Sequence, residues 1–594
     1  MKNHLAMMIR ETIDRYPDKP ALRWKEDGAW RELSFRQMGE RILDAAKGLL
    51  ELGLPEGGPT AIFSANKPGF TIADFATLSV RGVSVPIYAT NTARQAEYIV
   101  NDAQIPIVFV GGKDQYDKVR SFFDGSAWLK KIIVFDRTVD IRGHEPSMYF
   151  DDFLALGRES SRGAEVEARL AEAGPDELAT LIYTSGTTEE PKGVMLCHSN
   201  FHACFVAHEK RLDVSEKDVS LCFLPLTHVF ERAWTFFALV EGMTNNYCDD
   251  TTKVVEYLKE VRPTVMCAVP RFYEKIYSTV FERLESAPPL KRKLFRWAVA
   301  TGEQVYLLKK EAKAVPPLLA LKHKIADKLV LAKLREVVGG RIRYFPAAGA
   351  PLSRKIEEFF HSAGIFIACG YGLTETTATV TCHENTFYRP GTVGKPISGV
   401  EIKIAANGEI LVKGSTVMKG YYRKPQATAE VFEDGWFRTG DVGVIEDGYL
   451  TITDRIKDLM KTSGGKYIAP QLIETTIGKD YFIEQIAVIG DLRKYVSALI
   501  VPAFPALEEY AKSKGISFAS HEELVAKPEI VRFYQERIDQ NSGDLAGFER
   551  IKKFTLLARP FSQDAGEMTP TMKLKRKAIN EKFRDLIDGM YRER

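Results

Sequence analysis

Short apolar runs and helical repeats alternate along the first part of the chain. Apolar residues recur at helical spacing from Phe35 to Leu50, and Ser34 and Gln37 stand where a capping box would open this helix. Strands that alternate with helices predict parallel βαβ units. The apolar runs that suit strands lie at 61–63, 83–86, 107–110 and 132–135, and the helical patterns between them lie at 70–78 and 93–102.

The pattern changes at Glu401. Polar and apolar residues alternate over 401–404 and again over 409–412, with the turn pair Asn407-Gly408 between them. Two further Asp-Gly pairs, at 434–435 and 447–448, mark turns of the same kind. An antiparallel sheet is therefore predicted to follow the βαβ units.

Length, composition and net charge indicate how many domains to expect and which classes of partner to exclude. With 594 residues the chain is too long for one ordinary core, which predicts a large multilayered domain and at least one smaller domain. The 45% hydrophobic and 27% charged residues are typical of a soluble globular protein. A net charge of +3 gives no general attraction to nucleic acid, so none is expected as a partner.

The cysteines indicate a reducing compartment rather than a metal site. Seven are scattered without paired spacing, at positions 197, 204, 222, 248, 267, 369 and 382. Cys197, His198, His202 and Cys204 are close in sequence, but neither their spacing nor a second ligand cluster favours zinc. Reduced thiols in a cytoplasmic protein are expected.

No window of the sequence has the pattern of a signal peptide or of a membrane-spanning helix. The N-terminus lacks an uninterrupted apolar segment, and no window reaches the roughly 18 apolar residues of a spanning helix. The stretch 271–340 is helical and basic, with a Lys-Arg-Lys run at 291–293. A solvated helix face is the favoured interpretation of this run, and a contact with anionic lipid is the alternative. The protein is expected in the cytoplasm, with at most a peripheral contact at the inner membrane.

The residues that follow a predicted strand at 181–183 form a candidate phosphate-binding loop. Their hydroxyl groups, backbone N–H groups and one glycine suit a polyanion, and Lys192 adds a positive charge. The spacing differs from the Walker pattern. The plain alternative is a Ser/Thr-rich surface turn, which the following Pro-Lys-Gly and apolar run disfavour. The loop residues are Thr184, Ser185, Gly186, Thr187 and Thr188.

His228 follows another predicted strand, which ends at Phe223. A proline after the strand turns the chain and leaves this histidine near the carboxyl end of the strand, where open α/β sheets bind ligands. A histidine satisfied by packing is the alternative, and the motif alone does not decide between them.

The stretch 181–200, LIYTSGTTEEPKGVMLCHSN, resembles the phosphate loop of the adenylate-forming enzymes, which include acyl-CoA synthetases, luciferases and peptide-synthetase adenylation domains. Further motifs follow in the order of that family. They include YGLTET at 371–376 and DRIKD at 454–458. LPLTHVFER at 224–232, the long helical insert before residue 340 and the extended C-terminal domain most resemble the long-chain fatty acyl-CoA synthetases. One departure is Glu189, where the family usually has glycine.

The resemblance implies a role for each candidate residue. Glu375 would ligate Mg²⁺, Asp441 would accept the ribose hydroxyls, and Arg455 would contact ribose or phosphate. Lys573 would bridge the attacking carboxylate and the α-phosphate, whereas Lys575, Arg576 and Lys577 are interpreted as solvated charge. Adenine would be held by Gly349, Ala350, Pro351, Gly370, Tyr371, Gly372 and Thr374, with the aromatic ring stacked on the base. His228 would line the acyl site, and Lys192 would neutralise charge on pyrophosphate. Lys457 would act as the hinge between the domains, and Gly464 and Gly465 would line the CoA tunnel.

The implied fold is α/β. A large N-terminal domain of mixed βαβ sheets with a small β-barrel-like subdomain would span 1–456, and a small mobile α+β domain would span 457–594. The implied activity joins a long-chain fatty acid to CoA through an acyl-adenylate, with ATP and CoA as co-substrates and Mg²⁺ as cofactor. Aromatic side chains near His228, at 223, 230, 234, 236 and 237, together with Val229, would line the acyl tunnel.

Several alternatives remain open on sequence. A ligase that loads a carrier protein would share every ATP residue, and a CoA ligase for medium-chain or aromatic acids would differ only in its acyl site. A luciferase-like oxygenase and a non-catalytic acyl or nucleotide sensor are further alternatives, although a sensor would be expected to lose Glu375 or Lys573. A homodimer is neither favoured nor excluded.

Overall fold

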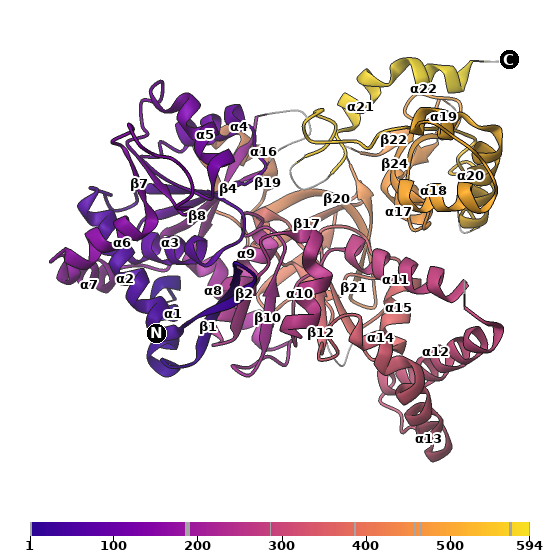
Figure 1. Cartoon of the computed structure of the whole chain (residues 1–594), viewed down its shortest axis with the longest axis horizontal. Coiled ribbons are helices and arrows are strands. Elements are labelled where there is room, and N and C mark those ends of the chain that lie inside the picture. The colour runs from indigo at the N-terminus through magenta and orange to yellow at the C-terminus, as the bar shows by residue number, and fades with distance from the viewer. Residues whose placement is uncertain are drawn as a thin grey trace.

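The computed structural model describes residues 3–184, 190–285, 287–384, 388–456, 458–463, 466–543, 545–569 and 573–592. The chain forms a large α/β part and a smaller α+β part, which is coloured orange to yellow at the C-terminal end in Figure 1. The predicted fold class is confirmed. Among the described helices, none combines the length and the apolarity needed to cross a lipid bilayer.

An eight-stranded sheet lies at the centre of the large part. Its strands from β8 to β7 pair in parallel, whereas β9 runs antiparallel to both β8 and β18. In spatial order the strands are β18 (Gly420–Tyr421), β9 (Lys192–Cys197), β8 (Leu178–Thr184), β4 (Val83–Tyr88), β3 (Pro59–Ser64), β5 (Ile107–Val110), β6 (Lys131–Val134) and β7 (Ser147–Tyr149).

Both faces of this sheet are buried. Ile62 and Phe109 contribute to one core, and the alternate residues Phe63 and Val110 contribute to the other, as the period of a strand requires. The second core contains residues of α4 (Ala93–Asp102) and α5 (Lys113–Phe123). The first contains residues of α1 (Leu5–Arg15), α2 (Phe35–Glu51), α3 (Pro68–Ser79), α6 (Phe150–Glu159), α7 (Gly163–Glu172), α8 (His198–Glu209) and α9 (Val229–Val240).

The start of α2 confirms the predicted capping box. The Ser34 side chain accepts a hydrogen bond from the Gln37 backbone N–H, and the Gln37 side chain accepts one from the Ser34 backbone N–H. Two otherwise unsatisfied N–H groups are thereby paired at the helix N-terminus, which sets where α2 begins.

Two four-stranded sheets carry most of the remaining site-forming segments. The apolar residues of 262–271 predict a buried strand of the same sheet as the strand before His228. The stretch contributes only isolated bridges, in which Val265 pairs with both Ser220 and Tyr344 and Ala268 pairs with Ala347. Pro263 and Pro270 lie near its two ends and have no N–H to extend the pairing. The first sheet has the order β10 (Val219–Cys222), β11 (Thr244–Tyr247), β1 (Pro20–Glu26), β2 (Ala29–Ser34), and the second β12 (Tyr344–Ala347), β13 (Phe366–Tyr371), β14 (Thr381–Cys382), β15 (Lys395–Pro396).

A five-stranded antiparallel sheet forms the predicted half-barrel. The expected turns are present, since Asp434, Gly435, Asp447 and Gly448 all have positive φ, as the turns of tight hairpins require. The sheet contains β16 (Val400–Ile404), β17 (Glu409–Gly414), β20 (Trp436–Glu446), β19 (Phe432–Glu433) and β21 (Tyr449–Arg455), with α16 (Pro425–Val431) beside it.

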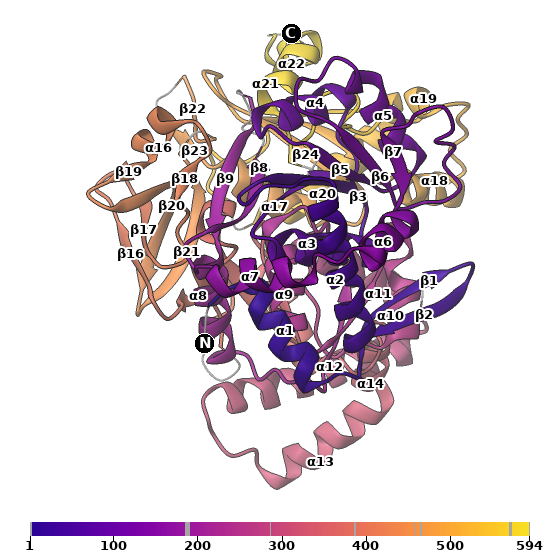
Figure 2. The ribbon, with the colours of Figure 1, turned by 90° about the vertical axis from the view of Figure 1, so that its left-hand side faces the viewer.

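Helices make up most of the stretch from 254 to 362. Figure 2 shows α13 as an arm beneath the large part, away from its sheets, and Figure 1 shows the same arm at one end of the molecule. The helices are α10 (Val254–Val261), α11 (Pro270–Glu285), α12 (Pro289–Lys310), α13 (Pro317–Ala326), a π-helical turn (Asp327–Leu331), α14 (Ala332–Glu336) and α15 (Arg354–Ser362), with a 3₁₀ turn before them at Thr251–Lys253.

The C-terminal part has its own cores. A three-stranded sheet of β24 (Ile483–Ile489), β25 (Ser497–Pro502) and β26 (Lys553–Leu556) is buried on both faces. The other elements are β22 (Met460–Lys461), β23 (Tyr467–Ile468), α17 (Pro470–Gly478), α18 (Phe504–Ser513), α19 (His521–Ala526), α20 (Pro528–Asn541), α21 (Arg576–Lys582) and α22 (Arg584–Tyr591).

Candidate functional site

The predicted phosphate loop joins two antiparallel strands of the central sheet. β8 ends at Thr184 and β9 begins at Lys192, and these two residues lie opposite each other in the strand pairing. The loop thus leaves and re-enters the sheet at one place. The predicted loop residues Ser185, Gly186, Thr187 and Thr188, and the unusual Glu189, lie outside the described residues.

The two predicted adenine segments emerge side by side. β12 and β13 are parallel and pair Ala347 with Cys369, so the segments that follow them leave from the same edge of the sheet. Gly349 has φ +94°, a conformation that favours glycine. At Gly372 an added Cβ would lie 2.1 Å from the carbonyl oxygen of Ala378, so a larger residue cannot fit there. Ala350 and Pro351 follow Gly349, and Gly370 stands before Tyr371.

Asp441 is held by two other candidate residues. The Tyr371 hydroxyl donates to Oδ2 of Asp441 over 2.6 Å, and Nε of Arg455 donates to Oδ1 over 2.8 Å. Asp441 is nearly buried, whereas Arg455 stays partly exposed. Because each carboxylate oxygen has a second lone pair, Asp441 can still accept ligand hydroxyl groups.

Tyr421 links the predicted metal ligand to the predicted phosphate-binding lysine. Its hydroxyl donates to Oε1 of Glu375 over 2.9 Å, and Nζ of Lys192 lies 5.6 Å from the centre of its ring. Glu375 lies in the 3₁₀ turn Thr374–Thr376, directly after β13. Sequence analysis did not single out Tyr421, because a tyrosine at a strand end carries no distinctive local signal.

Lys573 comes from the C-terminal part and reaches the same place. Burial lowers the pKa of its ammonium group and the charge of Arg455 lowers it further, whereas Asp441, Glu375 and Asp458 act in the opposite direction. The residue Lys573 as a whole is exposed to solvent, but its ammonium group is surrounded by protein atoms. Glu375 and Lys573, which are 198 positions apart in sequence, thus lie within electrostatic reach of each other.

The segment before Lys573 spans the gap between the two parts. Gln563 Nε2 donates to the carbonyl oxygen of Thr90 over 3.0 Å, and Figure 1 shows the yellow chain extending towards the large part ahead of α21. A second contact lies on α11, where the Tyr481 hydroxyl donates to Oε1 of Glu282 over 2.5 Å. Arg271, also on α11, donates to the carbonyl oxygen of Glu484 over 3.2 Å and forms an ion pair with the Glu484 carboxylate.

His228 is a neutral side chain beside this cluster. It caps α9, and its Nδ1 accepts a hydrogen bond from the Phe230 backbone N–H over 3.2 Å. Burial, with a further contribution from the charge of Lys573, lowers its pKa to about 4. Since Nδ1 is an acceptor, the hydrogen of the neutral ring is on Nε2, which can donate to a ligand.

Three of the aromatic residues expected to line an acyl tunnel, Trp234, Phe236 and Phe237, pack into the main core, whereas Phe223 lies in another core and Phe230 is half-buried. Phe236 packs against Phe75 and Phe201, and Phe237 packs against Phe205 and Trp234. The cause is that α9 is apolar around most of its circumference and is covered on all sides. These residues therefore support the strand and helix that carry His228.

Arg576 corrects one sequence interpretation. It was expected to be solvated, but it forms two hydrogen bonds to the carboxylate of Glu474, at 2.8 and 2.7 Å, and is mostly buried. A run of basic residues cannot reveal a partner on another helix. The predicted hinge residue Lys457 and the predicted tunnel residues Gly464 and Gly465 lie outside the described residues.

Together these groups form a site of mixed charge. Lys192, Arg455 and Lys573 supply three cations around the carboxylates of Glu375 and Asp441. Such a set can bind a polyanion through the cations, hold a hard divalent ion on a carboxylate, and orient sugar hydroxyls on the other.

Comparison with protein families matches nearly the whole chain. The model described as AMP-binding enzyme matches residues 9–422, and the model described as AMP-binding enzyme C-terminal domain matches residues 457–594. The chain is 35% identical to the long-chain-fatty-acid–CoA ligase FadD15 of Mycobacterium tuberculosis, over 99% of this chain and 97% of the relative. It is 31% identical to the peroxisomal long chain acyl-CoA synthetase 6 of Arabidopsis thaliana, over 95% of this chain and 82% of the relative.

Solved structures share the fold at lower sequence identity. The anthranilate CoA ligase AuaEII in complex with anthranoyl-AMP superposes with a TM-score of 0.74 at 17% identity, covering 99% of this chain and 98% of that one. The adenylation domain of a carboxylate reductase from Mycobacterium chelonae gives a TM-score of 0.76 at 23% identity, covering 99% and 91%.

Proposed function

Because this chain belongs to the family of AMP-binding enzymes, we propose that it is an AMP-forming long-chain fatty acid–CoA ligase. The observation that carries the proposal is the gathering of Lys573, Arg455, Asp441 and Glu375 from the two parts of the chain. Full-length similarity to long-chain-fatty-acid–CoA ligases supports the substrate class.

The first half-reaction activates the fatty acid. The carboxylate oxygen attacks the α-phosphorus of ATP, a C–O–P anhydride bond forms, and the bond to pyrophosphate breaks. Lys573 bridges the two anions and offsets their repulsion, and Lys192 neutralises charge that develops on pyrophosphate. Asp441 accepts the ribose hydroxyls, and Nε2 of His228 donates to the carboxylate. Here electrostatics and orientation supply the rate enhancement.

Glu375 fits the role of a magnesium ligand. It is a half-buried carboxylate whose Oε1 is oriented by the Tyr421 hydroxyl, with a lone pair left for a cation. Bound Mg²⁺ would neutralise phosphate charge at this place. Nζ of Lys192 lies 5.6 Å from the centre of the same Tyr421 ring, so the lysine and the carboxylate are both near enough to serve one triphosphate.

The second half-reaction transfers the acyl group. The CoA sulfur attacks the carbonyl carbon of the acyl-adenylate, a thioester forms, and AMP leaves. Lys573 is no longer needed, so the C-terminal domain, which we place at 457–594, rotates at Lys457 and brings Gly464 and Gly465 to the tunnel. The hydrogen bonds that Tyr481, Glu484 and Gln563 form with the large part are all at the surface or half-buried, which is compatible with such a rotation.

The reaction is tested by AMP release from purified protein with fatty acids of graded length, with and without CoA. Each buried methylene contributes about 0.8 kcal/mol, roughly a fourfold gain in binding. We expect kcat/KM to be at least about tenfold higher for an acid of about 14 to 18 carbons than for octanoate. A best substrate that is aromatic or short refutes the long-chain assignment, and turnover that free CoA does not saturate favours a carrier protein as acceptor.

We also propose that the α13 arm contacts an anionic membrane surface. Leu318, Leu321 and Ile325 of α13 and Leu329 of the π-helical turn that continues the arm recur at helical spacing, and they are 66%, 57%, 47% and 43% exposed. Exposed apolar stripes of this kind mark interaction surfaces. Lysines stand along the same arm at positions 322, 324, 328 and 333, so a lipid surface of negative charge complements it better than a second copy of the same basic helix does.

Vesicle binding tests this contact. We expect the full-length protein to sediment with vesicles of phosphatidylglycerol more than with phosphatidylcholine, and the triple variant Leu318→Ser, Leu321→Ser, Ile325→Ser to remain in solution. Leu492→Ser, which alters a 76% exposed leucine on the C-terminal part, is the matched control. Unchanged sedimentation of the triple variant refutes the contact, and a monomer–dimer shift caused by the same variant assigns the stripe to a homodimer.

We propose that the protein works in the cytoplasm. All seven cysteines are free thiols, as the sequence predicted. Free thiols, and substrates such as ATP and CoA, suit the reducing cytoplasm, with the α13 arm at the inner face of the membrane.

A further inference from the structure

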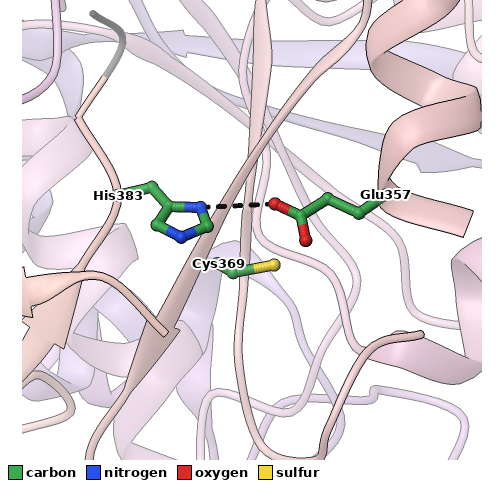
Figure 3. Close-up of side chains that lie close together, drawn as sticks. All are labelled: Glu357, Cys369 and His383. Carbon is green, nitrogen blue, oxygen red and sulfur yellow. Dashed lines mark ion pairs between the residues drawn. The ribbon is translucent and has the colours of Figure 1, made fainter. Parts of the chain in front are cut away.

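Three potential metal ligands lie close together next to the two predicted adenine segments. Glu357 on α15, Cys369 on β13 and His383 after β14 place their ligand atoms within 4.8 Å of one another. Figure 3 shows the three side chains gathered in one place. All three residues are buried. Their sequence positions gave no sign of this, since no two of them have the spacing of a metal motif.

The hydrogen bonds around His383 indicate which ring nitrogen carries its hydrogen. Thr392 Oγ1 donates to the carbonyl oxygen of Arg389 over 2.8 Å, so its own hydrogen is already used. The contact of 3.2 Å between His383 Nε2 and Thr392 Oγ1 must then have Nε2–H as the donor. In the neutral ring, Nδ1 therefore presents a lone pair.

That lone pair points at another acceptor. His383 Nδ1 lies 3.4 Å from Oε1 of Glu357, and both atoms are buried without a hydrogen-bond partner. Two acceptors that face each other in a buried place repel unless a cation lies between them. The other carboxylate oxygen, Oε2 of Glu357, is already held by the Gly391 backbone N–H over 2.9 Å.

The separation fits a metal ion better than a shared proton. Ligand atoms about 2.0–2.2 Å from a tetrahedral zinc ion lie roughly 3.4 Å apart, whereas a charge-assisted N–H···O bond is about 2.7–2.9 Å long. A thiolate and a carboxylate neutralise the two charges of the ion, so the buried site carries no net charge. The bond from His383 Nε2 to Thr392 supplies the outer support that metal-bound histidines usually have.

We propose that Glu357, Cys369 and His383 bind one zinc ion, which ties α15 to β13 behind the nucleotide site. Zinc accepts nitrogen, sulfur and oxygen ligands together, and three protein ligands leave a fourth position to water. His361 stands nearby but is not a ligand, since its Nε2 accepts from the Ile367 backbone N–H and its hydrogen is therefore on Nδ1. The role is structural, because α15 follows Gly349–Pro351 and β13 leads to Tyr371.

Metal content is the first test, and it is independent of ligase activity. Full-length protein purified without chelator is expected to hold about one zinc ion per chain by elemental analysis. Cys369→Ser and His383→Gln are expected to lose most of it, whereas Cys267→Ser, which alters another fully buried thiol outside the cluster, should keep it. Thr392→Val should weaken zinc binding about 10- to 100-fold by removing the acceptor for His383.

Cobalt gives a second readout that does not depend on the variants folding. Wild-type protein produced in zinc-depleted, cobalt-supplemented medium is expected to show thiolate-to-cobalt absorption, which identifies a sulfur ligand. Protein that contains no zinc and takes up no cobalt overturns the proposal, and a buried imidazolium–carboxylate pair then describes the cluster. Zinc that both ligand variants retain in full also overturns it, because the ion must then lie elsewhere.

Discussion

The hydroxyl of Tyr371 donates to Asp441 over 2.6 Å, which joins the end of β13 to the half-barrel sheet. The sequence resemblance gives Tyr371 the task of stacking on adenine and Asp441 the task of binding ribose. The hydrogen bond adds a dependence between the two, since Tyr371 also fixes the direction of the Asp441 carboxylate. If both implied roles hold, a single residue would position base and sugar together.

Tyr371→Phe is therefore predicted to impair ATP binding while it preserves the stacking ring. A hydrogen bond to a charged group contributes about 1.5–3 kcal/mol, so we expect KM for ATP to rise at least about tenfold. Initial rates at varied ATP measure this. Tyr534→Phe removes a buried tyrosine hydroxyl that donates to Phe482 in the C-terminal part, and it controls for loss of stability. Equal KM values for Tyr371→Phe and wild type would contradict the proposed role.

Lys573→Ala is predicted to separate the two half-reactions. Its ammonium group lies within reach of Asp441 and Glu375, so ATP–pyrophosphate exchange should fall at least about 100-fold. Thioester formation from supplied acyl-adenylate should remain within about threefold of wild type, because Lys573 has no role in that step. Lys577→Ala, four residues along the chain, is the control. If both half-reactions fall equally, Lys573 supports the structure rather than adenylation.

The buried ion pair between Arg232 and Asp74 is predicted to be essential for stability. Two hydrogen bonds of 2.9 and 2.6 Å join these fully buried side chains, and thereby α9 to α3. Arg232→Met leaves Asp74 as an unpaired buried charge and should cost about 3–5 kcal/mol of unfolding free energy. Denaturant unfolding measures this cost.

A second substitution distinguishes the charge from the packing. Adding Asp74→Leu to Arg232→Met removes both charges, so the double variant should regain most of the lost stability. Arg142→Ala, at an 89% exposed side chain that pairs with Asp140, should change unfolding free energy by less than about 1 kcal/mol. A double variant as unstable as the single one would assign the loss to packing.

Glu231 is predicted to make stability depend on pH. Burial raises its pKa from 4.5 in the unfolded chain to about 8 in the folded protein. Between these values the folded state holds the proton that the unfolded state has released, so folding stability falls as pH rises, on the order of 1 kcal/mol per unit. Glu231→Gln should flatten the fall in Tm from pH 5 to pH 8, and Glu303→Gln, on the surface, should not. Parallel Tm profiles would exclude this effect.

Local patterns predicted most elements correctly because their causes are local. The capping box at Ser34, the Asp-Gly turns of the half-barrel and the strand-and-helix alternation each depend on a few adjacent residues. The stretch 262–271 does not form the strand that its apolar residues predict, because its prolines interrupt the pairing. Arg576 is not solvated as predicted, because it bonds to Glu474 on another helix, and a local pattern cannot reveal such a partner.

The candidate site was predictable only as a list of separate motifs. The sequence by itself determined which groups have charges, hydroxyls or flexible backbone, and in which order they occur, since these are properties of single residues and short segments. Only the tertiary structure decided which of them meet: Lys573 with Asp441, Tyr421 between Lys192 and Glu375, and the cluster of Glu357, Cys369 and His383. Such contacts depend on how distant strands and helices pack, and no pattern of neighbouring residues encodes a distance across the fold.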